Sequence, residues 1–180
     1  ESPEHTARNA LIDAGFSAAV LRGLEQRGLI EAYDVEIVRD PLAHIDSAVP
    51  DDLALTTDQQ QTLDALGTAL DSGSFYPALL HGVTGSGKTL IYIRLAAQSL
   101  EQGRSTIVLV PEIALAWQMV RRFKEHFGAE VAVLHSQLSA GERYDTWRRL
   151  RRGEQRIVIG ARSAILAPVD KLGLIVVDEE

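Results

Sequence analysis

The stretch GVTGSGKT, Gly82 to Thr89, constrains the fold more than any other part of the sequence. It matches the pattern G-x-x-x-x-G-K-[ST] and lies between an apolar run, Ala78 to His81, and a helical pattern from Gly87 to Gln102. Glycines let the backbone turn its N–H groups toward phosphate oxygens, and the following helix adds the partial positive charge of its N-terminus. The sequence therefore predicts a phosphate-binding loop between a strand and a helix.

Each position of this loop has an expected task. Lys88 is expected to neutralise the β and γ phosphates, and the Thr89 hydroxyl to take a coordination place on Mg²⁺. The backbone of the remaining positions is expected to surround the phosphates. The predicted ATP-binding residues of the loop are Gly82, Val83, Thr84, Gly85, Ser86, Gly87, Lys88 and Thr89.

Strand and helix patterns alternate beyond the loop. Apolar runs predict strands over 106–110, 131–134, 156–159 and 174–177. Helices are expected over 112–127 and from a capping box at Ser139 and Glu142 to Gly153. This alternation predicts an α/β fold with a mostly parallel sheet covered by helices.

The last seven residues, LIVVDEE, combine a buried-strand pattern with acids at its carboxyl end. A nucleoside triphosphatase needs a second carboxylate that holds Mg²⁺ through its water shell, and Asp178 fits that role. Glu179 is placed to orient or deprotonate the attacking water. The predicted catalytic residues are Lys88, Asp178 and Glu179, with Thr89 and Asp178 serving the metal.

Gln59, upstream of the loop in LTTDQQ, has two possible roles. Its side-chain amide carries one donor and one acceptor site that match an adenine edge. Alternatively, Thr56 and Gln59 form a capping box at a helix start. The two roles are compatible, and the spacing favours neither.

Two further loops follow predicted strands, in VPEIALA and GARSA. Loops at the carboxyl ends of parallel strands meet at one sheet edge, where N–H groups, hydroxyls and an arginine can contact a nucleic-acid backbone. The candidate DNA-binding residues are Pro111, Glu112, Arg162 and Ser163. Alternatively, Pro111 and Glu112 only begin a helix and Arg162 is an ordinary surface arginine. The arginines from 148 to 152 form a basic patch, but bases in a last helical turn also complement the helix dipole, and that account is favoured.

The front of the chain predicts a separate domain. Helix, turn at Gly15, helix capped by Ser17, and two β-prone runs, Leu29 to Tyr33 and Val35 to Val38, follow the order of a winged helix that lacks its first helix. Residues 1–60 hold 12 acids against 4 bases, which favours a protein-docking role over DNA binding. The expected domains are 1–39, a linker over 40–53, and 54–180.

Composition excludes several classes. The chain has no cysteine, so disulfides, thiolate metal sites and thiol nucleophiles are excluded. No apolar run reaches the roughly 18 residues of a membrane helix, and the first residues lack a signal-peptide pattern, so a cytoplasmic protein without membrane contact is expected.

Taken together, GVTGSGKT, VPEIALA, LHSQLSAGER, IVIGARSA and VVDEE resemble the first motor lobe of the PriA family of primosomal replication-restart helicases, which belong to superfamily 2. The resemblance covers about residues 52 to 180, and the front segment is similar to that family's winged-helix domain. It implies a RecA-like lobe that ends within the Walker B motif, DEE of the usual DEEH. It places Gln59 on adenine and the Pro111 and Arg162 loops on single-stranded DNA.

The resemblance implies an ATP-dependent 3′ to 5′ DNA helicase that acts in restart of stalled replication forks and in primosome assembly. ATP and Mg²⁺ are the implied cofactors, and zinc is expected only in a part of the family outside these residues. Implied partners are single-stranded and forked DNA, primosome proteins and single-strand-binding proteins. A RecG-like fork-remodelling helicase and a non-enzymatic, nucleotide-gated docking module are the alternatives.

Overall fold

The computed structural model describes residues 6–33, 42, 45, 54–111 and 117–178. The chain divides into two compact units, residues 1–37 and 38–180. No helix in these described ranges is long and apolar enough to span a membrane.

The described part of the first unit holds two short helices, α1 (Arg8–Asp13) and α2 (Ala18–Gln26). The Ser17 hydroxyl caps α2 by accepting a hydrogen bond from the Val20 N–H at 3.3 Å, as predicted. Gly15 has a φ of 96°, a conformation that favours glycine, and ends the first helix.

The predicted strand from Leu29 to Tyr33 is wrong, because the structure forms no strand there. Strand preference depends on packing against neighbours, and Leu29 and Tyr33 are 68% and 54% exposed. The second predicted run, 35–38, lies outside the described residues, so the winged-helix assignment stays a prediction.

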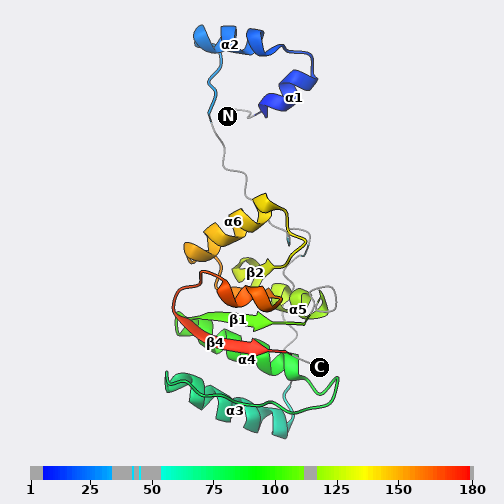
Figure 1. Cartoon of the computed structure of the whole chain (residues 1–180), viewed down its shortest axis with the longest axis vertical. Helices are drawn as coiled ribbons and strands as arrows, with labels where there is room; N and C mark the ends of the chain where they lie inside the picture. Colours follow the sequence, from blue (N-terminus) through cyan, green and yellow to red (C-terminus); the bar gives the residue numbers. More distant parts are fainter. Residues whose placement is uncertain (1–5, 34–41, 43–44, 46–53, 112–116, 179–180) are drawn as a thin grey trace. The chain divides into compact units, whose positions relative to one another are not determined.

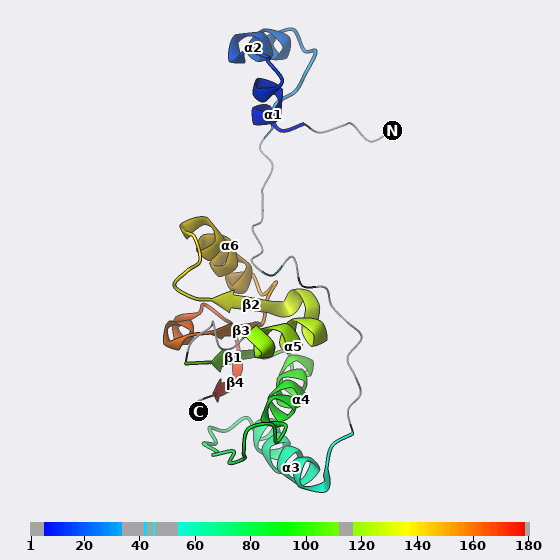
Figure 2. The same cartoon turned by 90° about the vertical axis from the view of Figure 1, so that its right-hand side faces the viewer.

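The second unit is built on a sheet of four described strands, β1 (Ser105–Leu109), β2 (Val131–Leu134), β3 (Ile157–Gly160) and β4 (Leu172–Val177). All described pairings are parallel, and the order is β2-β3-β1-β4. Figure 1 shows β1 and β4 side by side, and Figure 2 labels all four strands in this order. The predicted α/β fold with a mostly parallel sheet is therefore confirmed.

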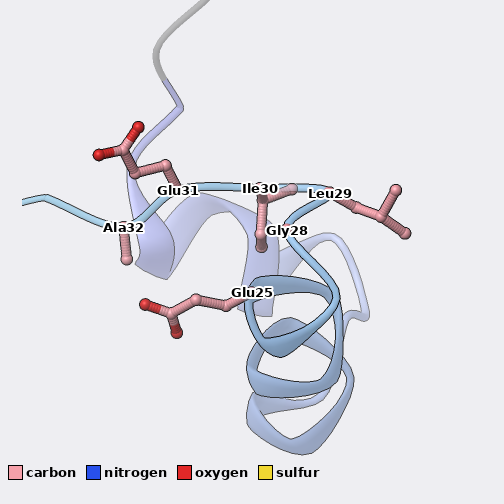
Figure 3. A pocket seen from close by; sticks show the side chains of 6 residues that line it. All are labelled: Glu25, Gly28, Leu29, Ile30, Glu31 and Ala32. Atoms are coloured by element: carbon pink, nitrogen blue, oxygen red, sulfur yellow. The ribbon is translucent and has the colours of Figure 1, made fainter.

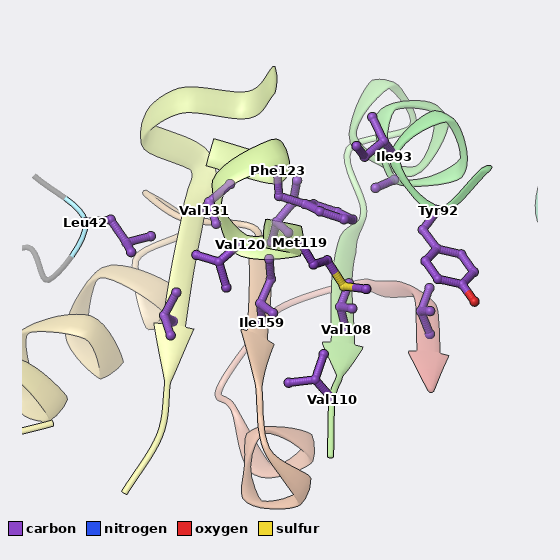
Figure 4. Packing of buried hydrophobic residues seen from close by; sticks show 14 residues of the cluster. Leu42, Tyr92, Ile93, Val108, Val110, Met119, Val120, Phe123, Val131 and Ile159 are labelled. Atoms are coloured by element: carbon purple, nitrogen blue, oxygen red, sulfur yellow. The ribbon is translucent and has the colours of Figure 1, made fainter. Parts of the chain in front are cut away.

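Helices cover both faces of the sheet (Figure 2). On one face, α4 (Lys88–Glu101) and α5 (Trp117–Phe127) enclose a core around Val120, Phe123 and Ile159 (Figure 4). On the other, α6 (Ala140–Arg151) and the 3-10 helix η2 (Arg162–Leu166) pack on Ile107 and Val158. A short 3-10 helix, η1 (Gly128–Glu130), leads into β2.

Helix α3 (Thr57–Asp71) packs against α4. Gln98 of α4 donates to the carbonyl oxygen of Gly67 at 3.1 Å and to Asp71 Oδ1 at 2.6 Å. A Cβ at position 67 would lie 2.8 Å from Gln98 Oε1, so the glycine allows this close approach. The contact fixes α3 on the helix that follows the predicted phosphate loop.

The predicted strand from Ala78 to His81 is also wrong, because residues 78–81 form neither helix nor strand. Residues 78–81 include none of the β-branched or aromatic residues that are enriched in strands, and the preceding Pro77 offers no N–H to a ladder. Leu79 is 93% exposed, whereas Leu80 packs against the core around Phe123. The segment touches the core without joining the sheet.

Parallel pairing gathers the functional loops at one edge of the sheet. The segments after β1, β3 and β4 all leave at the carboxyl ends of their strands. Helix α4 ends near the start of β1, so its N-terminus, which carries the glycine-rich loop, lies toward the same edge. This edge is where the candidate site is found.

We expect Phe123→Ala to lower the free energy of unfolding by about 3–5 kcal/mol, because its fully buried ring would leave a cavity. Phe75, which is 94% exposed, provides the matched control, and Phe75→Ala should change stability by less than about 0.5 kcal/mol. Urea unfolding followed by tryptophan fluorescence reports on the second unit, since Trp117 and Trp147 both lie in it. Equal losses of unfolding free energy in the two variants would contradict the burial of Phe123 in this core.

Candidate nucleotide-binding site

The glycine-rich loop has the geometry of an anion cradle. Gly85 and Gly87 have φ values of 80° and 87°, which other residues adopt only with strain. Gly87 is the N-cap of α4 and supplies no capping side chain, so the N–H groups of Lys88 and Thr89 begin the helix without an intrahelical acceptor. The first turn holds no acid. The loop thus presents N–H groups and a helix dipole to a negative ligand.

Lys88 is held across the loop. Its Nζ donates to the carbonyl oxygen of Gly82 at 2.7 Å and to that of Val83 at 3.3 Å. The ammonium therefore sits over the loop's own carbonyls, from which it can turn to a phosphate oxygen that offers a full negative charge.

Gln59 connects the start of α3 to this loop. Its Oε1 accepts the Thr56 N–H at 2.9 Å, and the Thr56 hydroxyl accepts the Gln59 N–H at 3.3 Å, so the predicted capping box is confirmed. Its Nε2 donates to the carbonyl oxygen of Ser86 at 2.8 Å. A Cβ on Gly87 would collide with that same Nε2. The amide therefore spans the helix start and the loop, which links their positions.

A hollow of about 240 Å³ opens between the α3 start and the loop. Its wall combines the capping box with the side of the loop and the first turns of α4. It is lined by Thr56, Asp58, Gln59, Thr62, Leu80, His81, Gly82, Ser86, Lys88 and Ile91. Adenine recognition by Gln59 stays a prediction, because both ends of its amide already have protein partners here.

Two hydrogen bonds hold Asp178 at the edge of the sheet where the glycine-rich loop lies. Its N–H donates to the carbonyl oxygen of Leu109 at 2.8 Å, which continues the pairing of β4 with β1. Its Oδ1 accepts the Tyr92 hydroxyl at 3.2 Å. Because Tyr92 lies three residues after Thr89 on α4, the two share one helix face. Asp178 is thereby tied to the helix turn next to the predicted metal ligand.

Tyr92 is protonated at neutral pH. Burial, the negative charge of Asp178 and their hydrogen bond, in that order, raise the pKa of Tyr92 to about 12. The phenol therefore acts as the donor and the carboxylate as the acceptor. Glu179, the predicted water-activating residue, and Glu180 lie outside the described residues.

The other predicted loops lie at the same sheet edge. Pro111 is exposed just after β1, and the preceding Val110 N–H donates to the carbonyl oxygen of Gly160 at 2.9 Å. Arg162 and Ser163 are exposed at the start of η2, directly after β3. Glu112 lies outside the described residues. The three described candidates, Pro111, Arg162 and Ser163, follow paired parallel strands and therefore lie at one edge of the sheet. Their contacts with DNA stay a prediction.

The arginine run lies elsewhere. Arg148, Arg149 and Arg151 occupy the last turn of α6, which leads to the start of β3 and thus to the opposite edge of the sheet. Arg148 lies over the Tyr144 ring, 5.6 Å from its centroid, and 3.7 Å from Asp145. Positive charge at this helix end complements the dipole, in agreement with the favoured account.

The donor set fits a divalent cation bound with a nucleotide. Within the described residues no group of three or more acidic or histidine side chains gathers that could hold a metal without other ligands. Phosphate oxygens, the Thr89 hydroxyl and the Asp178 carboxylate, the last through water, would be oxygen ligands of the kind that Mg²⁺ prefers. These protein groups therefore suit a cation that binds together with the nucleotide.

A second concave surface lies within the first unit and has different chemistry. A hollow of about 440 Å³ is lined by Glu25, Gly28, Leu29, Ile30, Glu31 and Ala32 (Figure 3). Its two carboxylates would repel phosphate, and none of its six described lining residues is basic. It does not fit a nucleotide.

Sequence reasoning missed two features of the site. It did not single out Tyr92, although Tyr92 lies three residues after Thr89 on a predicted helix. That spacing places both residues on one helix face and could have indicated that Tyr92 lies near the site. It also did not foresee that Gln59 would bind the loop, because a contact between residues 27 positions apart leaves no local pattern.

Comparison with known proteins matches residues 56–180 to the DEAD/DEAH box helicase family. The replication restart protein PriA of Bacillus subtilis (strain 168) is 48% identical over 164 residues, which cover 91% of this chain and 20% of that protein. PriA of Chlamydia pneumoniae is 44% identical over 170 residues, 93% of this chain and 22% of that protein. The resemblance inferred from the motifs is confirmed.

Among solved structures, the UvsW helicase from Bacteriophage T4 matches with a TM-score of 0.46 and 17% identity, over 82% of this chain and 53% of that one. The chain spans about a fifth of the length of the curated relatives named above.

Gln59→Glu keeps one of the two hydrogen bonds of the Gln59 side-chain amide and removes the other. A carboxylate keeps the acceptor for the Thr56 N–H and suits the helix N-terminus, but it loses the donor to Ser86. We expect faster amide hydrogen exchange over residues 83–87 with global stability changed by less than about 0.5 kcal/mol. Gln61→Glu, at an exposed position two residues on, is the control and should leave exchange unchanged. Unchanged exchange in Gln59→Glu would show that the bond does not hold the loop.

Proposed function

Because this chain belongs to the DEAD/DEAH box helicase family, we propose that it is the ATP-binding motor lobe of a 3′ to 5′ DNA helicase that acts in replication restart. One observation carries the proposal: the glycine-rich loop and Asp178 are tied to the same end of α4, by chain continuity and by the Tyr92 bond. A phosphate cradle beside a strand-end carboxylate is the arrangement that phosphoryl transfer to water requires.

The nucleotide is proposed to lie along the loop with its phosphates at the start of α4. Lys88 leaves the carbonyls of Gly82 and Val83 for the β and γ phosphates, where its charge is better compensated. Gln59 contacts the adenine edge after it releases either Thr56 or Ser86. Base recognition thereby becomes linked to the position of the loop.

When bound, Mg²⁺ would neutralise negative charge on the phosphates. The Thr89 hydroxyl is proposed to coordinate it directly, and Asp178 to hold its water shell. Glu179 accepts a proton from the attacking water or orients it. Zinc is proposed only for parts of such helicases outside these residues.

Turnover is proposed to need a second motor lobe. An arginine from that lobe stabilises charge on the transferring phosphoryl group, and closure of two lobes around ATP drives stepping along one DNA strand. Pro111, Arg162 and Ser163, with Glu112, form the proposed contact with single-stranded DNA at the shared sheet edge. Forked DNA, primosome proteins and single-strand-binding proteins are the proposed partners of the whole protein, which we place in the cytoplasm.

Residues 1–39 are proposed to form a partial winged-helix-like domain that docks a protein, joined by the linker 40–53 to the lobe that begins at residue 54. The acids that line its hollow, Glu25 and Glu31, favour a basic protein partner over DNA.

Glu179→Gln tests the enzymatic role in a protein that joins this chain to a second motor lobe. The amide keeps the side-chain shape but cannot accept a proton, so ATP affinity should stay within about twofold while turnover falls at least about 100-fold. Lys88→Ala is the companion variant and should lose nucleotide affinity. Steady-state ATPase assays and nucleotide titrations make the comparison. Full turnover in Glu179→Gln would contradict the role given to Glu179, whereas nucleotide binding without turnover in the unsubstituted protein would favour a non-enzymatic docking module.

The 180-residue chain alone should bind Mg·ATP weakly and turn it over hardly at all. The reason is that it holds one side of the site, whereas the transition-state arginine belongs to the second lobe in the proposed mechanism. The measurement is ATPase activity of the chain with and without single-stranded DNA. Rapid DNA-stimulated hydrolysis by these residues alone would contradict the proposal.

A further inference from the structure

We infer that Tyr92 is a positioning residue for Asp178: its hydroxyl fixes one carboxylate oxygen so that the other faces the cation bound with the nucleotide. The inference rests on the proposed function and goes one step beyond it, because it assigns a role to a residue outside the loop and acidic motifs. The observation is a hydrogen bond of 3.2 Å from the Tyr92 hydroxyl to Asp178 Oδ1.

The bond joins two elements that carry the two halves of the site. Tyr92 lies on α4, one turn after Thr89, and Asp178 follows β4. The ring is 8% exposed and belongs to the core cluster that includes Val176 of β4. Figure 4 shows the ring extending from α4 with its hydroxyl at the far end. Packing thus fixes the ring, and the fixed ring aims the hydroxyl.

A phenol is well suited to orient a metal-binding carboxylate. It donates one hydrogen bond to Oδ1 but carries no charge, so Asp178 keeps its full negative charge for the cation. A lysine or arginine in this place would neutralise the carboxylate and compete with Mg²⁺. Lys88, the basic side chain of the loop, donates instead to Gly82 and Val83. The neutral donor orients the carboxylate and leaves its charge available.

The bond is separable from the structural role of the ring. Packing of Tyr92 against the core uses its carbon atoms, which phenylalanine retains. The backbone position of Asp178 is held by its N–H bond to Leu109, which does not involve Tyr92. Tyr92→Phe therefore removes the orienting donor and leaves both the strand pairing and the helix packing.

The test measures affinity of the 180-residue chain for a fluorescent ATP analogue as Mg²⁺ is titrated. Tyr92→Phe should raise the Mg²⁺ concentration at half-saturation by about 3- to 10-fold, the effect of one typical intramolecular hydrogen bond, and leave affinity for the analogue without Mg²⁺ unchanged. Tyr144→Phe is the matched control, because Tyr144 is 64% exposed on α6, and it should behave like the unsubstituted chain. A Tyr92→Phe titration that superimposes on the control overturns the inference.

A double-substitution cycle distinguishes positioning from general destabilisation. If Tyr92 acts through Asp178, then Tyr92→Phe should have almost no further effect on Mg²⁺ dependence in an Asp178→Asn background. An undiminished effect there overturns the inference. Lys88→Ala distinguishes failure of the proposed nucleotide-binding function from failure of the positioning role. If Lys88→Ala abolishes analogue binding while Tyr92→Phe leaves Mg²⁺ dependence unchanged, only the positioning role fails. If Lys88→Ala binds normally, the proposed function fails and the inference fails with it.

Discussion

Parallel pairing of β4 with β1 is the constraint on which the site depends. Val176 lies opposite Val108 and Val177 opposite Leu109, and the next N–H, that of Asp178, donates to Leu109. Because the strands run the same way, a carboxylate that follows β4 must emerge at the edge where α4 begins. A register shift of one residue would turn the side chains of β4 to the opposite face of the sheet.

Preformed hydrogen bonds prepare the loop for its ligand. Gln59 holds Ser86 from one side, and Lys88 closes the loop over Gly82 and Val83 from the other. A cradle that is already ordered loses less conformational entropy when a phosphate arrives. In the proposed binding mode these bonds partly exchange, because the Lys88 ammonium would leave the carbonyl oxygens of Gly82 and Val83 for a phosphate. The loop is therefore held by contacts that are weaker than those a charged ligand offers.

Much of this arrangement follows from local sequence, and the rest depends on contacts that local sequence does not contain. The capping boxes at Thr56 and Ser139 were predictable because both partners lie within four residues. The strands of the sheet were predictable because apolar runs bounded by loops carry a strong signal. Residues 78–81 gave the same apolar signal but formed no strand, because strand formation needs a paired neighbour as well as burial. The bonds from Gln59 to Ser86 and from Tyr92 to Asp178 join residues 27 and 86 positions apart, so only the folded chain reveals them.

In the proposed site, Thr89 and Asp178 lie on either side of one cation bound with a nucleotide. Paramagnetic broadening of amide NMR signals by Mn²⁺, added with a non-hydrolysable ATP analogue in place of Mg²⁺, measures this arrangement. We expect the strongest broadening at the amides of residues 85–89 and of Asp178, and much weaker broadening at Gly153, which follows α6 at the opposite edge of the sheet. Broadening at the loop that spares Asp178, or broadening that persists without the nucleotide, would contradict it.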